Sequence, residues 1–332
     1  MLLLALATGL AHGEDVARFY EGKQIRLIIG ADVGGPYDAY GRLLSRHLAR
    51  HIPGHPRLVV QNMPGATSAI AGNYIYNKAP QDGTVIATNM NIVPLMKILG
   101  EVDIQFDPAR LNWVGNMARE TYTIYVRAAS AIQSLDDAKR SKVSMGATGP
   151  SAMTSVFPRV INHAIGTQFH VITGYPGMAA VQVALERGEV DGLAGDSWYN
   201  GRGQGISLNW FRNGTVRTLA LVASRRPPEF PGVPLLVDLA KDEDTRRLLE
   251  LFSSPADIGK PAIMGPDVPA ERVAAIRDAF NATMADPEFL ADAGKLNMPI
   301  DPISGEELST IVKRMMAAPD AVAQRAREAL RR

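Results

Sequence analysis

The chain has 332 residues, 46% of them apolar, which is enough apolar material for two modest hydrophobic cores. Lys plus Arg number 35 and Asp plus Glu number 34, so a formal net charge of +1 without basic runs argues against nucleic-acid binding. The sequence has no cysteine, which excludes disulfides, thiolate nucleophiles and cysteine-bearing zinc sites. This composition fits an exported protein that needs no thiols.

Residues 1–13 form a short apolar run that ends in the small residues Ala11 and Gly13, as at a signal-peptidase site. The run is too short to span a bilayer and is followed by Glu14 and Asp15. We therefore expect a signal peptide at 1–13, truncated at its start because the usual basic residues are missing. The mature protein is then expected to be periplasmic and soluble. The alternative is a buried N-terminal helix.

The first part of the chain alternates strand and helix patterns. Gln24–Gly30 is apolar on both faces, as in a central strand of a helix-covered parallel sheet. Ala39–His51 carries apolar residues at helical spacing, and residues 67–78 predict a second helix. Further strands are expected at Arg57–Gln61 and Thr84–Asn89. The order β-α-β-α-β predicts parallel strands joined by right-handed crossovers.

The pattern restarts after a strand at Tyr122–Arg127 and a short helix that opens at a capping serine, Ser134. Strand and helix patterns then alternate again, and the C-terminal part is helical. The expected strands are Lys142–Ala147, His170–Thr173, Val190–Ala194 and Val216–Ala223, and the expected helices are Ala152–Ala164, 178–187, Ala270–Ala285, Gly305–Ala317 and Asp320–Leu330. Two similar β-α-β series in one chain predict two α/β lobes.

A glycine loop joins the first strand to the first helix. Gly30 and the pair Gly34-Gly35 precede Asp38, and glycine lets the backbone come close to a ligand. The N–H groups of a helix start attract an anion. The alternative is an ordinary tight turn with Asp38 as the helix N-cap. Neither G-x-G-x-x-G nor a Walker lysine is present, so nucleotide binding loses support.

A second loop of this kind is Gly146–Ser151, which offers hydroxyls at Thr148 and Ser151, the latter a candidate helix cap. Ligands of open α/β sheets bind outside the carboxyl ends of the strands. Polar residues follow other strands too, at Asn62–Ser68, Asn89, Asn91, Tyr175–Gly177 and Asp196–Trp198. We expect these groups to line a cleft between the lobes. The alternative is plain turn chemistry.

Enzymatic and metal-binding functions receive little support. His47 and His51 are four residues apart but lack the glutamate of H-E-x-x-H, which predicts no metal site and a solvated basic helix face. No G-x-S-x-G is present, which disfavours a hydrolase. For an enzyme of small organic acids, Asp38 and Asp196 are the acid candidates. We predict neither catalysis nor a cofactor.

An ordered set of motifs resembles the Bug-type solute receptors of tripartite tricarboxylate transporters and covers nearly the whole mature chain. The motifs are Val33-Gly34-Gly35-x-x-Asp38, Asn62-x-Pro64-Gly65-Ala66, Pro80-x-Asp82-Gly83, Tyr175-x-Gly177, Gly188-Glu189-Val190-Asp191, Arg217-Thr218-Leu219-Ala220 ahead of Arg225-Arg226, Pro231-Gly232-Val233-Pro234 and Met264-Gly265-Pro266-Asp267-Val268-Pro269. Each motif is weak by itself, whereas the ordered set is fairly specific.

The resemblance implies an α/β periplasmic-binding-protein fold of two lobes, the Venus flytrap of type II, acting as a monomer. It further implies that loop amides, hydroxyls and water hold the carboxylate of a small organic acid in the cleft. One large and one small membrane subunit would then take the solute. The implied ligand-binding residues are Gly34, Gly35, Tyr37, Asp38, Thr67 and Asn89 in the first lobe, and Thr148, Gly149, Ser151, Tyr175 and Asp196 in the second.

The sequence departs from the family pattern at four places in these loops. Val33 stands where a proline is usual, Tyr37 replaces a small residue, Thr67-Ser68 replaces a glycine pair, and Pro176 replaces a basic residue. These changes widen the expected ligands from di- or tricarboxylates to monocarboxylates, aromatic acids and amide-bearing solutes. A receptor that signals through a membrane sensor is the alternative to uptake.

We expect lobe 1 to comprise residues 14–124 plus 225–332 and lobe 2 to comprise residues 125–224. Tyr122–Arg127 and Val216–Ala223 are the expected hinge strands, because they lie where the two β-α-β series must be joined twice. Closure around the ligand would then be a hinge motion.

Overall fold

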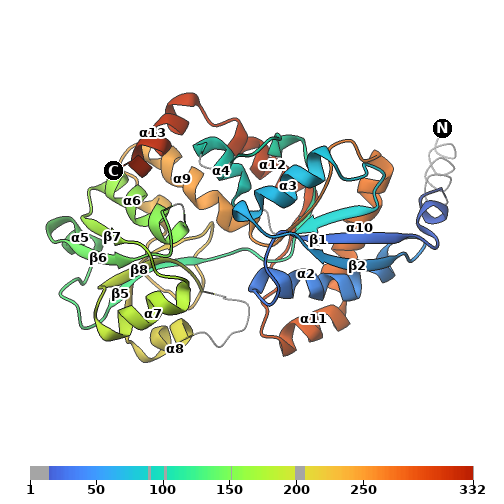
Figure 1. Ribbon diagram of the computed structural model, residues 1–332. Coiled ribbons are helices and arrows are strands. Elements are labelled where there is room, and N and C mark those ends of the chain that lie inside the picture. The colour runs from blue at the N-terminus through green and yellow to red at the C-terminus, as the bar shows by residue number, and fades with distance from the viewer. Residues whose placement is uncertain (1–14, 89–90, 101–102, 151, 199–205, 332) are drawn as a thin grey trace. The chain divides into compact units, whose positions relative to one another are not determined.

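The structure of the protein is a computed structural model that describes residues 15–88, 91–100, 103–150, 152–198 and 206–331 (Figure 1). The expected signal peptide lies outside the described residues. Contacts divide the chain into two compact units: unit 1 runs to residue 119 and includes 258–316, and unit 2 comprises 120–257 and 317–332. Within the described part of the chain, no helix combines the length and apolarity needed to cross a membrane.

Unit 1 is built on a six-stranded sheet of order β11-β4-β10-β3-β1-β2. The strands are β1 (Gln24–Ile29), β2 (Arg57–Asn62), β3 (Val85–Thr88), β4 (Asn112–Asn116), β10 (Pro261–Met264) and β11 (Ile303–Ser304). Strand β1 pairs parallel with both β2 and β3, as the β-α-β-α-β pattern predicts, and β10 pairs antiparallel with β3 and β4. The carboxyl ends of β1, β2 and β3 therefore share one edge of the sheet.

Helices of unit 1 cover this sheet with apolar faces. In α2, Tyr40, Leu43 and Leu44 recur at helical spacing and are buried in one core cluster with Phe280 of α10 and Phe289 of α11. The helices are α2 (Pro36–His47), α3 (Ala69–Asn77), α4 (Val93–Leu99), α10 (Ala270–Ala285), α11 (Pro287–Lys295) and α12 (Gly305–Met316), with 3-10 turns η1 (Leu48–His51), η2 (Ala66–Ser68) and η3 (Pro108–Arg110).

Unit 2 is built on a five-stranded sheet of order β7-β6-β8-β5-β9. The strands are β5 (Tyr122–Arg127), β6 (Val143–Gly146), β7 (Phe169–Ile172), β8 (Gly192–Ser197) and β9 (Val216–Val222). Strand β6 pairs parallel with β7 and β8, whereas β5 pairs antiparallel with β8 and β9. The carboxyl ends of β6, β7 and β8 therefore share one edge.

The helices of unit 2 come from two separate parts of the chain. They are α5 (Leu135–Arg140), α6 (Met153–Ile165), α7 (Met178–Arg187), α8 (Ile206–Asn213), α9 (Glu243–Ile258) and α13 (Asp320–Arg331), with the 3-10 turn η4 (Leu236–Leu239). Ser134 caps α5 as predicted, since its Oγ accepts the Asp137 N–H at 3.2 Å.

The unit boundaries differ from the expected lobes. The C-terminal α13 packs on α6 although the two lie far apart in the sequence (Figure 1). The segment after β9 also stays with unit 2, because Leu235 forms a β-bridge with Leu221 of β9. Residues 225–257 and 317–332 therefore belong to unit 2. The expected hinge strands do not join the units, because β5 and β9 pair with each other along their lengths inside unit 2.

Candidate ligand-binding edges

Three loops of unit 1 meet where β1, β2 and β3 end. Ile29 is in register with both Asn62 and Thr88, so the segments that follow these residues lie side by side. We call residues 30–38, 62–68, 88 and 91 the unit 1 edge. The structure thus brings together Gly34, Gly35, Tyr37, Asp38 and Thr67 on one edge, whereas Asn89 lies outside the described residues.

Asp38 is buried at this edge, with an exposed fraction of 3%, and both carboxylate oxygens accept hydrogen bonds. Oδ1 accepts from Asn62 Nδ2 at 2.8 Å, and Oδ2 accepts from the Gly34 N–H and from Arg42 Nε, each at 2.9 Å. Burial by itself would raise the pKa of Asp38, but the hydrogen bonds from Arg42, Gly34 and Asn62 outweigh it and lower the pKa to about 2. Asp38 therefore stays ionised, and its carboxylate holds the loop after β1 through the Gly34 N–H and joins it to Asn62.

The prediction that Asp38 is the N-cap of the first helix is wrong. The N-cap is Gly35, Pro36 occupies the first helical position, and the Asp38 carboxylate reaches back to the Gly34 N–H. The first intrahelical bond is donated by the Ala39 N–H to Gly35 O at 3.0 Å. The amides of Tyr37 and Asp38 precede that bond, and a helix start of this kind favours an anion.

The loop after β2 has an unusual backbone. Ala66, Thr67 and Ser68 have φ values of 45°, 53° and 70°, which is left-handed backbone that costs side-chain-bearing residues about 1–2 kcal/mol each. Ser68 Oγ donates to Gly30 O at 2.9 Å and so ties this loop to the loop after β1. A Cβ on Gly30 would lie 3.0 Å from Ser68 Cβ, so a larger residue at position 30 would push this loop outward. Thr67 itself is exposed.

Two further residues at this edge were not predicted from the sequence. The hydroxyl of Thr88, at the end of β3, is buried and makes no hydrogen bond within the described part of the chain. Lys260, just before β10, is 4% exposed and places Nζ 3.9 Å from the centroid of the Tyr37 ring. The position of Thr88 at the end of a strand could have predicted it as a site residue. No local sequence pattern could have predicted that Lys260 contacts Tyr37.

Unit 2 has a comparable edge where β6, β7 and β8 end, formed by residues 147–150, 173–177 and 196–198, which we call the unit 2 edge. The Thr148 N–H donates to Thr154 Oγ1 at 3.2 Å, and Ser155 Oγ donates to Gly149 O at 2.6 Å, so the first turn of α6 holds this loop. Tyr175 is half-buried. Ser151, the predicted cap, lies outside the described residues, and the N-cap of α6 is Ala152.

Asp196 is buried at the unit 2 edge, with an exposed fraction of 2%. Its Oδ2 accepts from Tyr125 Oη at 3.0 Å, and its backbone oxygen accepts from Thr123 Oγ1 at 3.0 Å. Burial, and then the neighbouring Asp196 carboxylate, raise the pKa of Tyr125 well above its usual value. The Asp196 carboxylate thus binds to β5 of its own unit.

An aromatic cluster packs beside Tyr125, which donates to this carboxylate. The ring centroids of Trp198 and Phe230 are 4.7 Å apart, those of Trp198 and Phe211 are 5.2 Å apart, and those of Phe211 and Phe230 are 5.6 Å apart, all edge to face. Phe211 also contacts the Tyr125 ring at 5.1 Å. Edge-to-face pairs contribute about 0.5–1.5 kcal/mol beyond their buried area. Sequence reasoning missed this aromatic cluster because its members come from separate elements.

The two histidines of α2 and η1 bind acids. His47 Nε2 lies 3.1 Å from Asp292 Oδ2, and His51 Nε2 lies 2.7 Å from Asp286 Oδ2. The predicted solvated face is wrong for His47, which is buried and packs edge to face on Phe289. In the parts of the chain that the structure describes, no cluster of three or more histidine and acidic side chains suits a metal ion.

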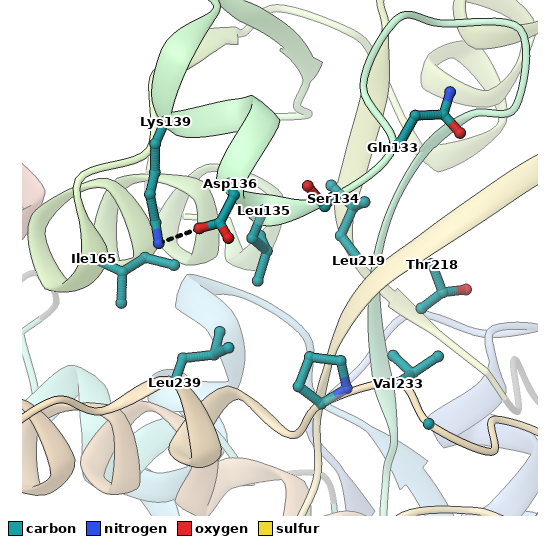
Figure 2. A pocket seen from close by; sticks show the side chains of 12 residues that line it. Gln133, Ser134, Leu135, Asp136, Lys139, Ile165, Thr218, Leu219, Val233 and Leu239 are labelled. Carbon is teal, nitrogen blue, oxygen red and sulfur yellow. Dashed lines mark hydrogen bonds and ion pairs between the residues drawn. The ribbon is translucent and has the colours of Figure 1, made fainter.

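A cavity of about 350 Å³ lies elsewhere in unit 2 (Figure 2). Leu135 of α5 and Leu239 of η4 point toward each other across it, and the ion pair of Lys139 Nζ with Asp136 Oδ1, 2.7 Å long, lies at its side. None of the predicted site residues that the structure describes lines this cavity. It borders Leu219 within β9 and is therefore distinct from the unit 2 edge.

The fold is that of two-lobed periplasmic binding proteins. Three solved structures align with it: a TctC solute-binding protein from Polaromonas without ligand (TM-score 0.73, 20% identity, 92% of this chain and 99% of that one), Rpa4515 of R. palustris with adipate (0.60, 19%, 92% and 97%), and MatC from Rhodopseudomonas palustris with malate (0.60, 15%, 93% and 99%). At these identities the likeness shows the fold alone.

The sequence defines the family. Residues 42–309 match the tripartite tricarboxylate transporter family receptor, TctC, and the chain belongs to this family. Two relatives from Bordetella are each 25% identical to it: a UPF0065 protein of Bordetella bronchiseptica, over 70% of this chain and 67% of the relative, and the protein BugT of Bordetella pertussis, over 68% of each. The Bug-type resemblance of the loop motifs is thereby confirmed, and the chain is a receptor of the solute-binding kind.

Proposed function

We propose that this receptor captures a small organic acid through its carboxylate and delivers it to the large and small membrane subunits of a tripartite transporter. The observation that carries the proposal is the family match over residues 42–309, which includes parts of both edges. The site of action would be the periplasm, reached after removal of residues 1–13, and the receptor would act as a monomer without chemical turnover.

Glycines at the two edges support close approach of a ligand to the backbone. Gly35, Gly149 and Gly177 do not adopt left-handed backbone, and among the described residues a Cβ at any of them would meet at most one atom, Asp32 O at 3.8 Å from Gly35. Neither conformation nor packing therefore demands glycine there. A ligand that contacts the loop backbone would demand it.

The ligand class follows from the chemistry of the edges. The start of α2 favours an anion, and hydroxyls of Thr67 and Thr148 can donate to it. Val33, with an exposed fraction of 71%, offers apolar surface beside the glycine pair. We therefore infer an acid with an apolar body; solved relatives hold adipate and malate. The proposed site residues, whether they contact the ligand or position those that do, are Gly34, Gly35, Tyr37, Asp38, Thr67, Asn89, Thr148, Gly149, Ser151, Tyr175 and Asp196.

Asp38 and Asp196 contribute indirectly in this proposal. Both carboxylates are buried and accept hydrogen bonds from their own unit, and a direct contact with a ligand carboxylate would be repulsive. They would hold Gly34 and the end of β8 in place.

A thermal-shift screen of the full chain tests the function, with adipate, malate, aromatic acids and the corresponding amides as probes. A ligand at 100 times its dissociation constant should add about 2.7 kcal/mol to the free energy of unfolding. If no acid shifts the melting temperature, capture of a carboxylate is wrong.

Two matched variants test the contribution of the loops. Gly35→Val and Gly149→Val add side chains that would meet at most one described atom, so both should fold and lose the ligand shift. Gly35→Val also replaces the glycine N-cap of α2 and should melt slightly lower in the apo form. Gly166→Ala, at the left-handed C-cap of α6 away from both edges, should keep the ligand shift. A full ligand shift in both valine variants would show that the ligand does not approach these glycines.

A further inference from the structure

A buried cation packs against the first helix of unit 1. Lys260 Nζ lies 3.9 Å from the centroid of the Tyr37 ring and 5.6 Å from that of Tyr40, and the lysine is 4% exposed. Tyr37 is half-buried at the unit 1 edge, on the turn of α2 that follows Gly35. Removing an ammonium from water is costly, so a lysine at this position is unexpected if packing is its only role.

The backbone around Lys260 is fixed by the last residue of β4 and the residue that follows it. The Lys260 N–H donates to Asn116 Oδ1 at 2.7 Å, and Lys260 O accepts the Met117 N–H at 3.0 Å. The preceding Gly259 has a φ of 49°, and a Cβ there would lie 1.9 Å from Ala118 O. Glycine is therefore required at 259, and the close approach that it permits sets the path of Lys260.

We propose that Lys260 is a positioning residue that makes the unit 1 edge selective for a carboxylate over a neutral amide, and that it acts through the Tyr37 ring. The proposal rests on the proposed function of solute capture. A cation over the ring face holds the ring by its quadrupole. The ammonium also withdraws electron density from the phenol, which makes its hydroxyl a stronger donor to an anion. In poorly solvated surroundings the positive charge itself attracts the carboxylate.

The charge of Lys260 is sensitive to pH. Burial lowers the pKa of Lys260 to about 7. Ionisable groups on the elements packed around it include Tyr37 and Tyr40 of α2, and Arg119 after β4, which pairs with Asp301 and Glu307. A bound carboxylate favours the protonated lysine and raises its pKa. Binding therefore takes up a proton near neutral pH and weakens as the pH rises from 6 to 8.

Isothermal titration calorimetry tests this coupling with adipate and malate and their diamides as probes, at pH 6 and pH 8, in buffers of different ionisation enthalpy. The wild type should bind the acid about tenfold more tightly at pH 6 than at pH 8 and take up a fraction of a proton. Lys260→Met should lose the proton uptake and most of the preference for acid over amide, and Tyr37→Phe should lose the preference while retaining affinity for the apolar body. Lys313→Met, an exposed lysine of α12, is the matched control.

The outcomes separate the two proposals. If the wild type binds neither acids nor amides, solute capture itself is contradicted and this inference falls with it. If the wild type binds an acid and Lys260→Met binds it with unchanged affinity, proton uptake and acid preference, capture stands and the role of Lys260 is overturned. Circular dichroism and apo melting temperatures of the variants exclude misfolding, and tighter binding of the diamide by the wild type also overturns the inference.

Discussion

At the unit 1 edge, a buried carboxylate is held by an amide, a guanidinium and a loop N–H. At the unit 2 edge, a buried carboxylate is held by a tyrosine hydroxyl whose ring packs on an aromatic cluster. Both carboxylates lie at carboxyl ends of parallel strands, so the topology of the two edges is alike. The polar network around Asp38 fixes a loop, and Tyr125 with the rings packed beside it fixes the end of β8. Equivalent places in one fold class are thus stabilised by different chemistry.

The two edges also differ in backbone strain. Among the described residues, the non-glycine residues with positive φ are His55, Ala66, Thr67, Ser68 and Asn297, all in unit 1. Three of them form the loop after β2 at the unit 1 edge. We infer that unit 1 stores strain next to its site, while unit 2 relies on packing.

Removing a ring from unit 2 should have the largest effect. Phe230 is buried against Trp198 and Phe211, so Phe230→Ala should lower the free energy of unfolding by about 3–4 kcal/mol. Amide hydrogen exchange of β8 and β9 under mild urea measures the loss in unit 2. Phe230→Leu retains most of the volume and should cost about 1 kcal/mol. A loss below about 1 kcal/mol for the alanine variant would contradict the packing account of this edge.

Neutralising the carboxylate of unit 1 should cost less and depend on pH. Asp38→Asn should lower stability by about 2 kcal/mol at pH 7, because the pKa of Asp38 is lowered to about 2 from its usual 3.8. A lowered folded-state pKa gives stability that is present above about pH 4 and is lost as the pH falls through about 2. The difference from the wild type should therefore shrink between pH 4 and pH 2 in urea titrations.

The matched control for that variant is Asp278→Asn, an exposed acid on α10 of the same unit. It should change the stability by less than about 0.5 kcal/mol at either pH. If Asp38→Asn lowers the free energy of unfolding by the same amount at every pH, the packing of the side chain, and not its charge, accounts for the contribution of Asp38 to stability.

Deleting one hydroxyl should have a smaller effect in unit 2. Tyr125→Phe keeps the ring contact with Phe211 but removes the donor to Asp196 Oδ2. A lost hydrogen bond to a buried carboxylate should cost about 1.5–2 kcal/mol. Thermal unfolding by calorimetry measures it, with Tyr76→Phe of unit 1, which stacks on Phe106, as the control. An unaltered melting temperature would show that Asp196 is held by other groups.

Relieving strain in unit 1 should give the smallest change, and of the opposite sign. Thr67 has a φ of 53°, so Thr67→Gly removes a left-handed cost of about 1–2 kcal/mol while adding about 1 kcal/mol of unfolded-chain entropy. We expect a net gain of at most about 1 kcal/mol in chemical denaturation. Thr67→Ala keeps the left-handed backbone strain, so its free energy of unfolding should not rise. If Thr67→Gly instead lowers the free energy of unfolding, the side chain of Thr67 stabilises the protein by more than its strain costs.

Much of the fold could be predicted because it rests on local patterns. The strand Tyr122–Arg127 and the helix Ala270–Ala285 have the predicted bounds, and the parallel pairing of β1 with β2 and β3 follows from the order of elements. Other elements were missed, among them α9 and α11. Helix α9 contains Pro255, a residue that argues against a helix interior when only the sequence is read. The unit boundaries were misplaced because α13 packs on α6, a contact without a local signal.

The sequence by itself determined that glycines and polar residues follow the strand ends. Strands and turns can be predicted locally, because their signals extend over only a few neighbouring residues. The sequence also determined the family, through the order of its loop motifs. Only the tertiary structure decided that Asp38 turns back to Gly34 instead of capping the helix, that Asp196 turns to Tyr125, and that Lys260 lies at the Tyr37 ring. The last two join residues far apart in the chain, and a buried charge is stabilised by whichever partners the folded chain brings within reach.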